Sequence, residues 1–478
     1  MLPAWQPVAV SSHRLARHAV NGAALDIRSL MSQVPETSRF LTVDELHADL
    51  ERLADAHPDL ATLRRVGTSR LGEPIRMLSI GHGRHNAFLF GCPHPNEPIG
   101  AQMLHHFSQA LCADEELRDS HDYTWHLIPC VDPDATRLNE GWFAGPFTPR
   151  HYARNFYRPA GHEQVEWTFP ISYKRLYFDA PIPETQMLMR VIDELKPELM
   201  VSLHNAGFGG VYYYVSGGDG AYFDALHRLP EWESLPLSLG EPEVPYLTEL
   251  APAIFPMIDT RAFYDFTEAN GGDPAARPHG TSSAQYAEKY GTHYLVTEMA
   301  YFDDARVNDT SVTGRNRREA ILASLDDADD HAAILREHFE ATAADLRGDS
   351  PFQHAVAWWI EALGNDRETE RTWARNNPET DRPATVAELF SSEIEAPFYR
   401  LLSLGMLVRM LEGELAIGNV TPRIREHAVL ANEAFDRRAT QLETALDYRV
   451  VPIRKLMSVQ FGATLATADY LQRLRASP

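Results

Sequence analysis

The segment His94-Pro95-Asn96-Glu97 places two metal-binding side chains three positions apart. It follows the apolar run 88–91, which we expect to form a buried strand, and it precedes apolar residues with helical spacing over 99–111. A turn between a strand and a helix is held by rigid elements on both sides. His94 and Glu97 are therefore candidate metal ligands.

Two further polar residues end apolar runs later in the chain. His204 follows the run 199–203, and Glu298 follows the run 293–297. Two histidines and one glutamate leave the fourth position of a tetrahedral zinc ion open for water, and zinc lowers the pKa of that water to about 7. A second carboxylate can then accept the proton of the water and pass it to the leaving group. Together with the first pair, these two residues predict a hydrolytic zinc site.

The composition excludes several kinds of partner. The formal net charge of -23 over 478 residues argues against nucleic acid, whose binding needs a basic face, and against an anionic membrane surface. The most apolar later stretch, 401–408, is too short to span a bilayer, and no signal-peptide pattern opens the sequence. Three cysteines, a small and odd number, give no disulfide framework. We therefore expect a cytoplasmic protein with reduced thiols.

Apolar runs of strand length alternate with helical patterns as far as residue 298. Expected strands cover 63–66, 76–80, 87–90, 125–131, 199–203, 211–215 and 293–297. Expected helices cover 42–56, 99–112, 184–195 and 282–290. This alternation predicts an α/β fold, with a mixed, mostly parallel twisted sheet flanked by helices. The candidate site residues then lie at the carboxyl ends of strands, where open α/β sheets bind ligands.

We expect three regions along the chain. Residues 1–38 are mixed in polarity and form an N-terminal arm, and residues 39–348 form the catalytic domain. Within that domain, the long segment 138–183 is rich in aromatic residues and proline, and we interpret it as a wall of the substrate cleft. A long helix is expected over 315–346, and helical periodicity over 349–478 predicts an additional all-α domain. This last domain either caps the cleft or mediates self-association into a homo-oligomer.

Several ordered motifs resemble those of one family. They are residues 66–75, His94-Pro95-Asn96-Glu97, Asp132-Pro133-Asp134, Arg137-Leu138-Asn139-Glu140-Gly141, Ala153-Arg154-Asn155-Phe156, His204 and Glu298. In type and order they resemble the motifs of the carboxypeptidase A-type zinc metallocarboxypeptidases, over residues 42–345. The succinylglutamate desuccinylase and aspartoacylase-like relatives resemble the chain less closely. The resemblance does not cover residues 351–478.

The resemblance implies a zinc carboxypeptidase-like fold and one Zn²⁺ per chain. It implies that His94, Glu97 and His204 hold the metal. It also implies that Glu298 is the general base. These assignments agree with the chemistry inferred from the residue types alone.

The resemblance also assigns roles to two arginines. It implies that Arg137 stabilises the oxyanion that develops on the attacked carbonyl. Arg154, whose guanidinium is a planar fork, and Asn155 are implied to bind the terminal carboxylate of the substrate. The family usually has Asn directly before this arginine, whereas this chain has Ala153. The family also has a mobile Tyr upstream of the general base, and none stands at the expected spacing near 273–277.

We therefore expect a zinc-dependent metallocarboxypeptidase that hydrolyses the C-terminal peptide bond, or a peptide-like amide bond, of a peptide or conjugate. The two departures from the family pattern leave the zinc chemistry intact and bear on which bond is cut. One alternative keeps the same core but makes the protein an amidase of cell-wall peptides or an N-acyl amino acid deacylase. A second alternative is a non-catalytic zinc-binding scaffold. The expected partner is a peptide or a small amide-linked substrate, not nucleic acid or a membrane.

Overall fold

The computed structural model describes residues 25–276 and 279–477. Residues 1–24 of the predicted N-terminal arm lie outside this range. From residue 25 the arm forms the short helix α1 (Ile27–Ser32), which packs on the C-terminal helix and buries Met31. No helix in the described ranges is long and apolar enough to cross a membrane.

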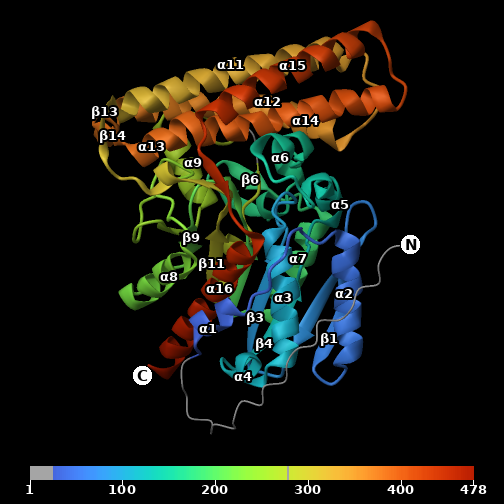
Figure 1. Ribbon diagram of the computed structural model, residues 1–478, viewed down its shortest axis with the longest axis vertical. Coiled ribbons are helices and arrows are strands. Elements are labelled where there is room, and N and C mark those ends of the chain that lie inside the picture. Colours follow the sequence, from blue (N-terminus) through green and yellow to red (C-terminus); the bar gives the residue numbers. More distant parts are fainter. Residues whose placement is uncertain (1–24, 277–278, 478) are drawn as a thin grey trace.

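An eight-stranded sheet forms the centre of the described chain (Figure 1). Its spatial order is β1-β2-β4-β3-β7-β11-β9-β10. The strands are β1 (Ala61–Thr68), β2 (Pro74–Ile80), β4 (Tyr123–Ile128), β3 (His85–Gly91), β7 (Leu199–Leu203), β11 (His293–Glu298), β9 (Tyr212–Val215) and β10 (Ile254–Pro256). The central strands β4, β3, β7 and β11 are parallel, while β1, β2 and β4 pair antiparallel, as do β11 and β9. The predicted α/β class with a mixed, mostly parallel sheet is confirmed.

Both faces of the sheet are buried, and β3 shows how its side chains divide between them. Ala87 and Leu89 belong to one apolar core, and Phe88 and Phe90 belong to another. This division follows from the alternation of side chains along a strand. A strand buried on both faces has an almost continuous apolar sequence, which is why this run was recognisable.

Helices cover each face of the sheet. The first face is covered by α2 (Val43–Ala56), α3 (Ile99–Ala113), α8 (Gly220–Glu233) and α16 (Ile453–Ala476), and the second by α7 (Pro183–Leu195) and α10 (Ser283–Ala287). The expected start of α2 is confirmed, because Thr42 and Glu45 form a capping box. Smaller elements at the sheet are α4 (Glu115–Asp119), α5 (Pro133–Arg137) and α9 (Thr260–Ala269).

The segment 138–183 was expected to be a long loop, but it contains regular structure. It includes α6 (Pro149–Asn155) and the hairpin of β5 (Ile171–Tyr173) and β6 (Leu176–Phe178). These elements are short, so the apolar periodicity that reveals longer ones is absent from the sequence. Its residues nevertheless approach the predicted site, as described below.

The later part of the chain is mainly helical and includes a bundle that lies beyond one end of the sheet (Figure 1). The bundle is made of α11 (Arg317–Ala343), α12 (Pro351–Asn376), α13 (Val386–Phe390), α14 (Ala396–Ala416) and α15 (Pro422–Ala445), with a π-helical turn at Ser391–Glu395. A short antiparallel pair of strands, β13 (Val312–Asn316) and β14 (Pro383–Thr385), joins the segments that precede α11 and α13. The predicted all-α character is therefore confirmed for most of this region.

The chain leaves the bundle and returns to the sheet at its C-terminal end. The strand β15 (Tyr448–Val450) pairs with β12 (Ala300–Asp304), which also pairs with β8 (Ala206–Phe208). The following helix, α16, packs on α3, α8, β7 and β11. The last helix of the predicted helical domain thus forms part of the layer that covers the sheet.

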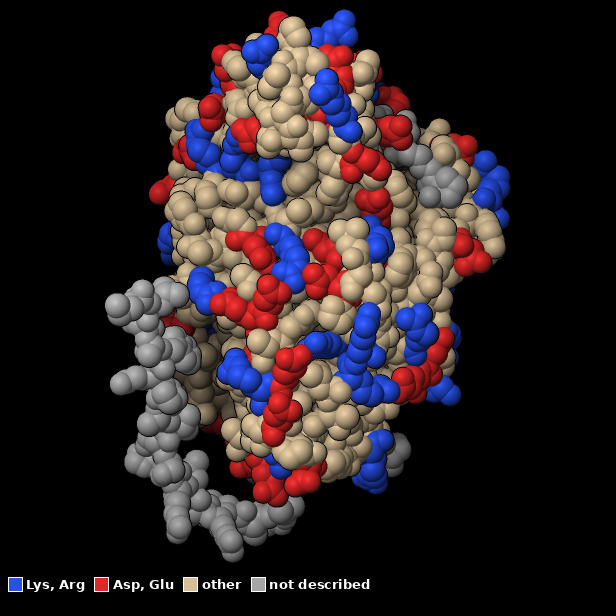
Figure 2. Space-filling model, turned by 90° about the vertical axis from the view of Figure 1, so that its right-hand side faces the viewer, with Lys and Arg blue, Asp and Glu red and all other residues tan. Residues whose placement is uncertain are grey.

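Charged side chains of both signs are interspersed over the face shown in Figure 2. Many charged side chains of the described residues form ion pairs, such as Arg137 with Asp44. The large negative net charge is therefore not gathered into one acidic patch on this face.

Asp132 is a fully buried carboxyl group at the turn that follows β4. Its Oδ1 accepts a hydrogen bond from the N–H of Ala135 and so caps α5, while its Oδ2 lies 3.6 Å from Arg70 Nη2. Burial raises the pKa of Asp132 to about 7, although Arg70 acts in the opposite direction. The family motif that the turn resembles has Asn at this position.

We predict that Asp132→Asn raises the free energy of unfolding relative to the wild type, and that this gain is larger at neutral pH than at acidic pH. Because the folded state holds the Asp132 proton more tightly than the unfolded chain, the contribution of Asp132 to the free energy of unfolding falls as the pH rises from about 4 to about 7. Asn keeps the capping oxygen but cannot ionise, so the variant gains on the order of 4 kcal/mol over the wild type across this interval. Urea unfolding of both proteins at several pH values measures this gain. Parallel pH profiles would contradict it.

Candidate metal centre

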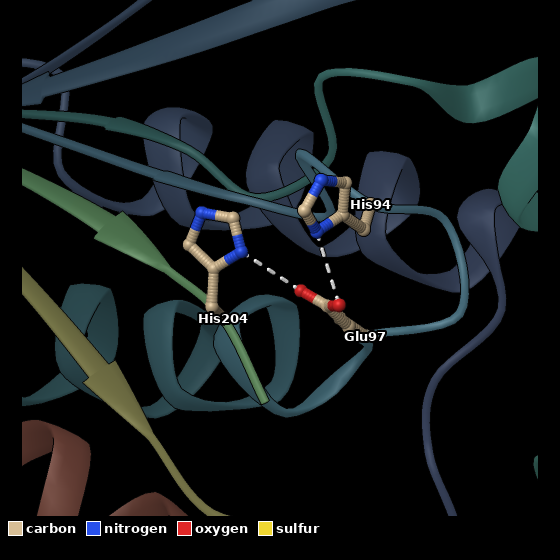
Figure 3. Close-up of side chains that lie close together, drawn as sticks. All are labelled: His94, Glu97 and His204. Carbon is tan, nitrogen blue, oxygen red and sulfur yellow. Dashed lines mark hydrogen bonds and ion pairs between the residues drawn. The ribbon is translucent and has the colours of Figure 1, made fainter. Parts of the chain in front are cut away.

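The three predicted ligands lie together at the carboxyl ends of two neighbouring strands (Figure 3). His94 and Glu97 belong to the turn between β3 and α3, and His204 directly follows β7. Since β3 and β7 are parallel and Gly91 pairs with Leu203, both strands end at the same edge of the sheet. This edge is where open α/β sheets bind ligands.

Glu97 lies between the two imidazole rings. Its Oε1 is 3.0 Å from His94 Nδ1, and its Oε2 is 3.0 Å from His204 Nδ1. The two ring centroids are 4.8 Å apart, and each of the three residues is less than 9% exposed. Zinc bonds of about 2.0–2.2 Å put neighbouring ligand atoms of a tetrahedral site roughly 3.4 Å apart. The group therefore needs only small shifts to hold zinc.

The protonation states of the group also fit a metal site. Burial, helped by Arg158, lowers the pKa of His94 to about 3 and so keeps its imidazole neutral. Burial opposes ionisation of Glu97, but His94 and His204 outweigh it and hold the pKa of this carboxyl well below its usual range. Neutral histidine and ionised carboxylate are the forms that bind zinc.

Glu298, the predicted general base, is a buried carboxyl group beside the metal group. It is the last residue of β11, and its Oε1 lies 3.9 Å from His204 Nδ1. Its Oε2 is buried and has no hydrogen-bond partner among the described residues. Burial, together with the charges of Glu97 and Glu243, raises the pKa of Glu298 well above its usual value. A carboxylate with raised proton affinity and a free oxygen is suited to accept a proton.

Arg158 is a cation near the metal group that the sequence analysis missed. Its Nη1 lies 3.7 Å from Glu97 Oε1, and its Nε donates a hydrogen bond to Gln164 Oε1 at 3.1 Å. Its guanidinium also stacks over the ring of Trp167, 5.8 Å from the centroid. The motif analysis selected Arg154 in the same stretch, because the family pattern ends before position 158.

Arg137 makes its ion pairs outside the metal group. It lies in the last turn of α5, where its Nε donates to Glu73 at 3.0 Å and its Nη2 donates to Asp44 at 2.6 Å. These two carboxylates raise the pKa of the Arg137 guanidinium. Its predicted role as the oxyanion-stabilising cation stays a prediction.

Arg154 and Asn155 end α6, which docks on the helical bundle. Arg154 Nη2 binds Asn432 at 2.9 Å and also pairs with Glu412, and Asn155 Nδ2 donates to the carbonyl of His151 at 2.9 Å. The predicted binding of a substrate carboxylate by these two side chains stays a prediction. In this structure the Arg154 guanidinium is directed to α14 and α15.

Ala153, where the family usually has Asn, lies at the same contact. Ala153 is fully buried, and its carbonyl oxygen lies so close to α14 that a Cβ atom at Gly405 would clash with it. Arg409 of α14 also donates to the carbonyls of Asn155 and Phe156, at 2.6 and 3.0 Å. Ala153 therefore lies in the contact between α6 and α14.

The helical bundle reaches segments that adjoin the metal group. The N–H of Gly207, three residues after His204, donates to the Tyr399 hydroxyl at 3.1 Å. Trp167 lies 6.3 Å from His94 between ring centroids and 5.7 Å from Trp358 of α12. Of the two interpretations left open for this region, these contacts favour the cap.

Comparison with known proteins shows which family the central segment resembles. Residues 46–239 match the zinc carboxypeptidase family, Peptidase_M14. Carboxypeptidase E of Caenorhabditis elegans is 29% identical over 154 residues, which cover 30% of this chain and 33% of that protein. Zinc carboxypeptidase A 1 of Anopheles gambiae is 30% identical over 98 residues, which cover 20% and 23%. The chain thus matches a third or less of the length of these curated relatives.

Among solved structures, carboxypeptidase A of Helicoverpa armigera is 11% identical with a TM-score of 0.37, over 74% of this chain and 79% of that chain. A metallo-carboxypeptidase of Burkholderia cenocepacia is 12% identical with a TM-score of 0.33, over 54% and 60%. The matched residues 46–239 contain His94, Glu97 and His204, the group that can hold a metal ion. This segment of the chain is therefore similar to the zinc carboxypeptidase family.

Proposed function

We propose that this protein is a zinc-dependent metallocarboxypeptidase that hydrolyses the C-terminal peptide bond, or a peptide-like amide bond, of a peptide or conjugate. The observation that supports this most is the buried group of His94, Glu97 and His204 with the free Oε2 of Glu298 beside it. This arrangement provides three ligands and a separate base, as hydrolysis by a zinc-bound water requires.

In this proposal Glu298 moves the proton of the attacking water. Zinc held by the three ligands would supply a water whose pKa is about 7. Glu298 would accept the proton of such a water on its unpartnered Oε2 and would deliver it to the nitrogen of the leaving amine. The burial that raises the pKa of Glu298 makes it a better proton acceptor than an exposed carboxylate.

Arg158 supplies positive charge where the substrate gains negative charge. It is held by Gln164 and Trp167 and lies 3.7 Å from Glu97, so its guanidinium is fixed beside the ligands. A preorganised cation of this kind stabilises a developing oxyanion or binds a carboxylate. Arg137 and Arg154 are the alternatives from the sequence, and each would first have to leave the acidic partners that it has in the structure.

A second function, amidase or N-acyl amino acid deacylase activity, has one observation in its favour. The family element that binds a terminal carboxylate contains Ala153 here, and its Arg154 is paired with Glu412 of the bundle. A substrate without a free C-terminal carboxylate has no need of that element. The free base Glu298 speaks against the scaffold alternative. A cytoplasmic location and self-association through residues 349–478 stay predictions.

We predict that Glu298→Gln keeps zinc and loses activity. The change removes proton transfer but none of the three ligands, so turnover falls by about 10²–10⁴-fold while the zinc content stays that of the wild type. Mass spectrometry of a peptide library, supplemented with acylated amino acids and cell-wall peptides, reads the products of both proteins. Release of single C-terminal residues supports the carboxypeptidase, and cleavage of only the supplements supports the amidase or deacylase. Equal turnover by the two proteins would refute the role of Glu298.

We predict that Arg158→Ala is more harmful to catalysis than Arg154→Ala. Loss of a fixed cation at the reacting centre costs about 10²–10³-fold in kcat. Arg154→Ala removes contacts with the bundle, so we expect it to lower the free energy of unfolding instead. Steady-state kinetics and urea unfolding of both variants separate the two effects, with Arg137→Ala as a third comparison. A larger loss of kcat in Arg154→Ala would show that the sequence motif had identified the right arginine.

A further inference from the structure

A second buried carboxylate, Glu166, is connected to the metal group through one hydroxyl. Ser202 Oγ donates a hydrogen bond to Glu166 Oε1 at 3.1 Å and lies 2.8 Å from His204 Nε2. Glu166 is 5% exposed, Ser202 is fully buried and His204 is 7% exposed. The three side chains form a continuous path from a carboxylate to the ring nitrogen that faces away from Glu97.

Local structure brings these side chains together. Ser202 is the fourth residue of β7 and His204 follows the strand, so the two side chains are two positions apart and point to the same face. Glu166 comes from a 3-10 turn, Val165–Trp167, in the segment that contributes Trp167 beside His94. The path therefore connects His204 to the segment whose Trp167 lies beside the other predicted ligand, His94.

The donors around Glu166 decide the direction of the hydrogen bonds. Its carboxylate also accepts from Ser283 N and Ser283 Oγ, both at 2.8 Å, and from the Tyr294 hydroxyl at 3.3 Å. An ionised carboxylate only accepts hydrogen bonds, so the single proton of the Ser202 hydroxyl is directed to Glu166. Ser202 Oγ then accepts from the Nε2–H of His204.

This direction selects the form of His204 that binds a metal. When Nε2 carries the proton, the lone pair of the neutral ring is on Nδ1, the atom that faces Glu97. His94 has no equivalent support, because its Nε2 is buried without a hydrogen-bond partner among the described residues. Partners of this kind fix the tautomer and orientation of metal-binding histidines in other proteins.

We propose that Glu166 is a positioning residue that acts through Ser202 to hold His204 in the tautomer and orientation needed to bind zinc. The proposal rests on the proposed zinc function and adds to it a determinant of zinc affinity. Glu166 does not touch the substrate or the reacting atoms in this account. Its effect is on the metal.

A purely structural role for Glu166 is the main competing explanation. Through Ser283 and Tyr294, Glu166 also ties its turn to α10 and β11. Two serine variants separate these roles, because each removes one hydroxyl from Glu166. Ser202→Ala cuts the path to His204 and leaves the bonds from Ser283 and Tyr294. Ser283→Ala removes one of those bonds and leaves the path intact.

We expect Ser202→Ala and Glu166→Gln to bind zinc about 10–100-fold more weakly than the wild type. Ser283→Ala should bind zinc as the wild type does, even if it unfolds at a lower urea concentration. Combining Glu166→Gln with Ser202→Ala should weaken zinc no further than Ser202→Ala alone, because both changes break the same path. Competition of each full-length protein with a chromophoric chelator measures the affinity, and urea unfolding of the metal-free proteins measures folding separately.

The outcomes distinguish this proposal from the zinc function on which it rests. Zinc binding that is lost in His94→Ala but unchanged in Ser202→Ala would overturn the role of Glu166 and leave the zinc centre in place. Equal weakening in Ser202→Ala and Ser283→Ala would show that Glu166 only supports the fold. Absence of zinc binding by the wild type would overturn both proposals.

Discussion

The structure depends on keeping one ionised carboxylate, Glu97, buried at the edge of a sheet. A buried charge is costly unless it is paired and hydrogen-bonded. Here each oxygen of Glu97 is 3.0 Å from an imidazole nitrogen, close enough for a hydrogen bond from a protonated nitrogen or for a metal ion bound by both groups, and Arg158 adds positive charge nearby. The two strands that bring these partners together are parallel and end side by side. The parallel pairing of these strands therefore places the groups that can bind a metal next to the groups that stabilise the buried carboxylate.

The helical bundle packs against the elements around this arrangement. It packs on α6, contacts Gly207 through Tyr399 and approaches Trp167 through Trp358. These contacts occupy the element in which the family places its carboxylate-binding arginine. Arg154 is paired with Glu412 of the bundle, whereas Arg158 lies beside the metal group. The bundle thus packs against segments that adjoin the metal group.

The sequence predicted those parts of the site that rest on local patterns. Glu298 ends an apolar strand, and His94 and His204 follow the ends of two others; strand ends are readable from the sequence. The environment of Arg154 was not readable, because its partners Glu412 and Asn432 lie more than 250 positions away. Glu166 was missed for a similar reason, since it sits in a three-residue turn without a periodic pattern. The return of α16 to the sheet likewise depends on packing, because its helical pattern does not specify a partner.

The central claim is that His94, Glu97 and His204 together bind a zinc ion, with Glu298 close by but not a ligand. The most direct test is a crystal structure of the zinc-loaded protein with diffraction data collected on both sides of the zinc absorption edge. Our account predicts one anomalous peak per chain, bound by Nδ1 of each histidine and by the Glu97 carboxylate. A peak at another position, or one in which Glu298 replaces a histidine as ligand, would contradict it.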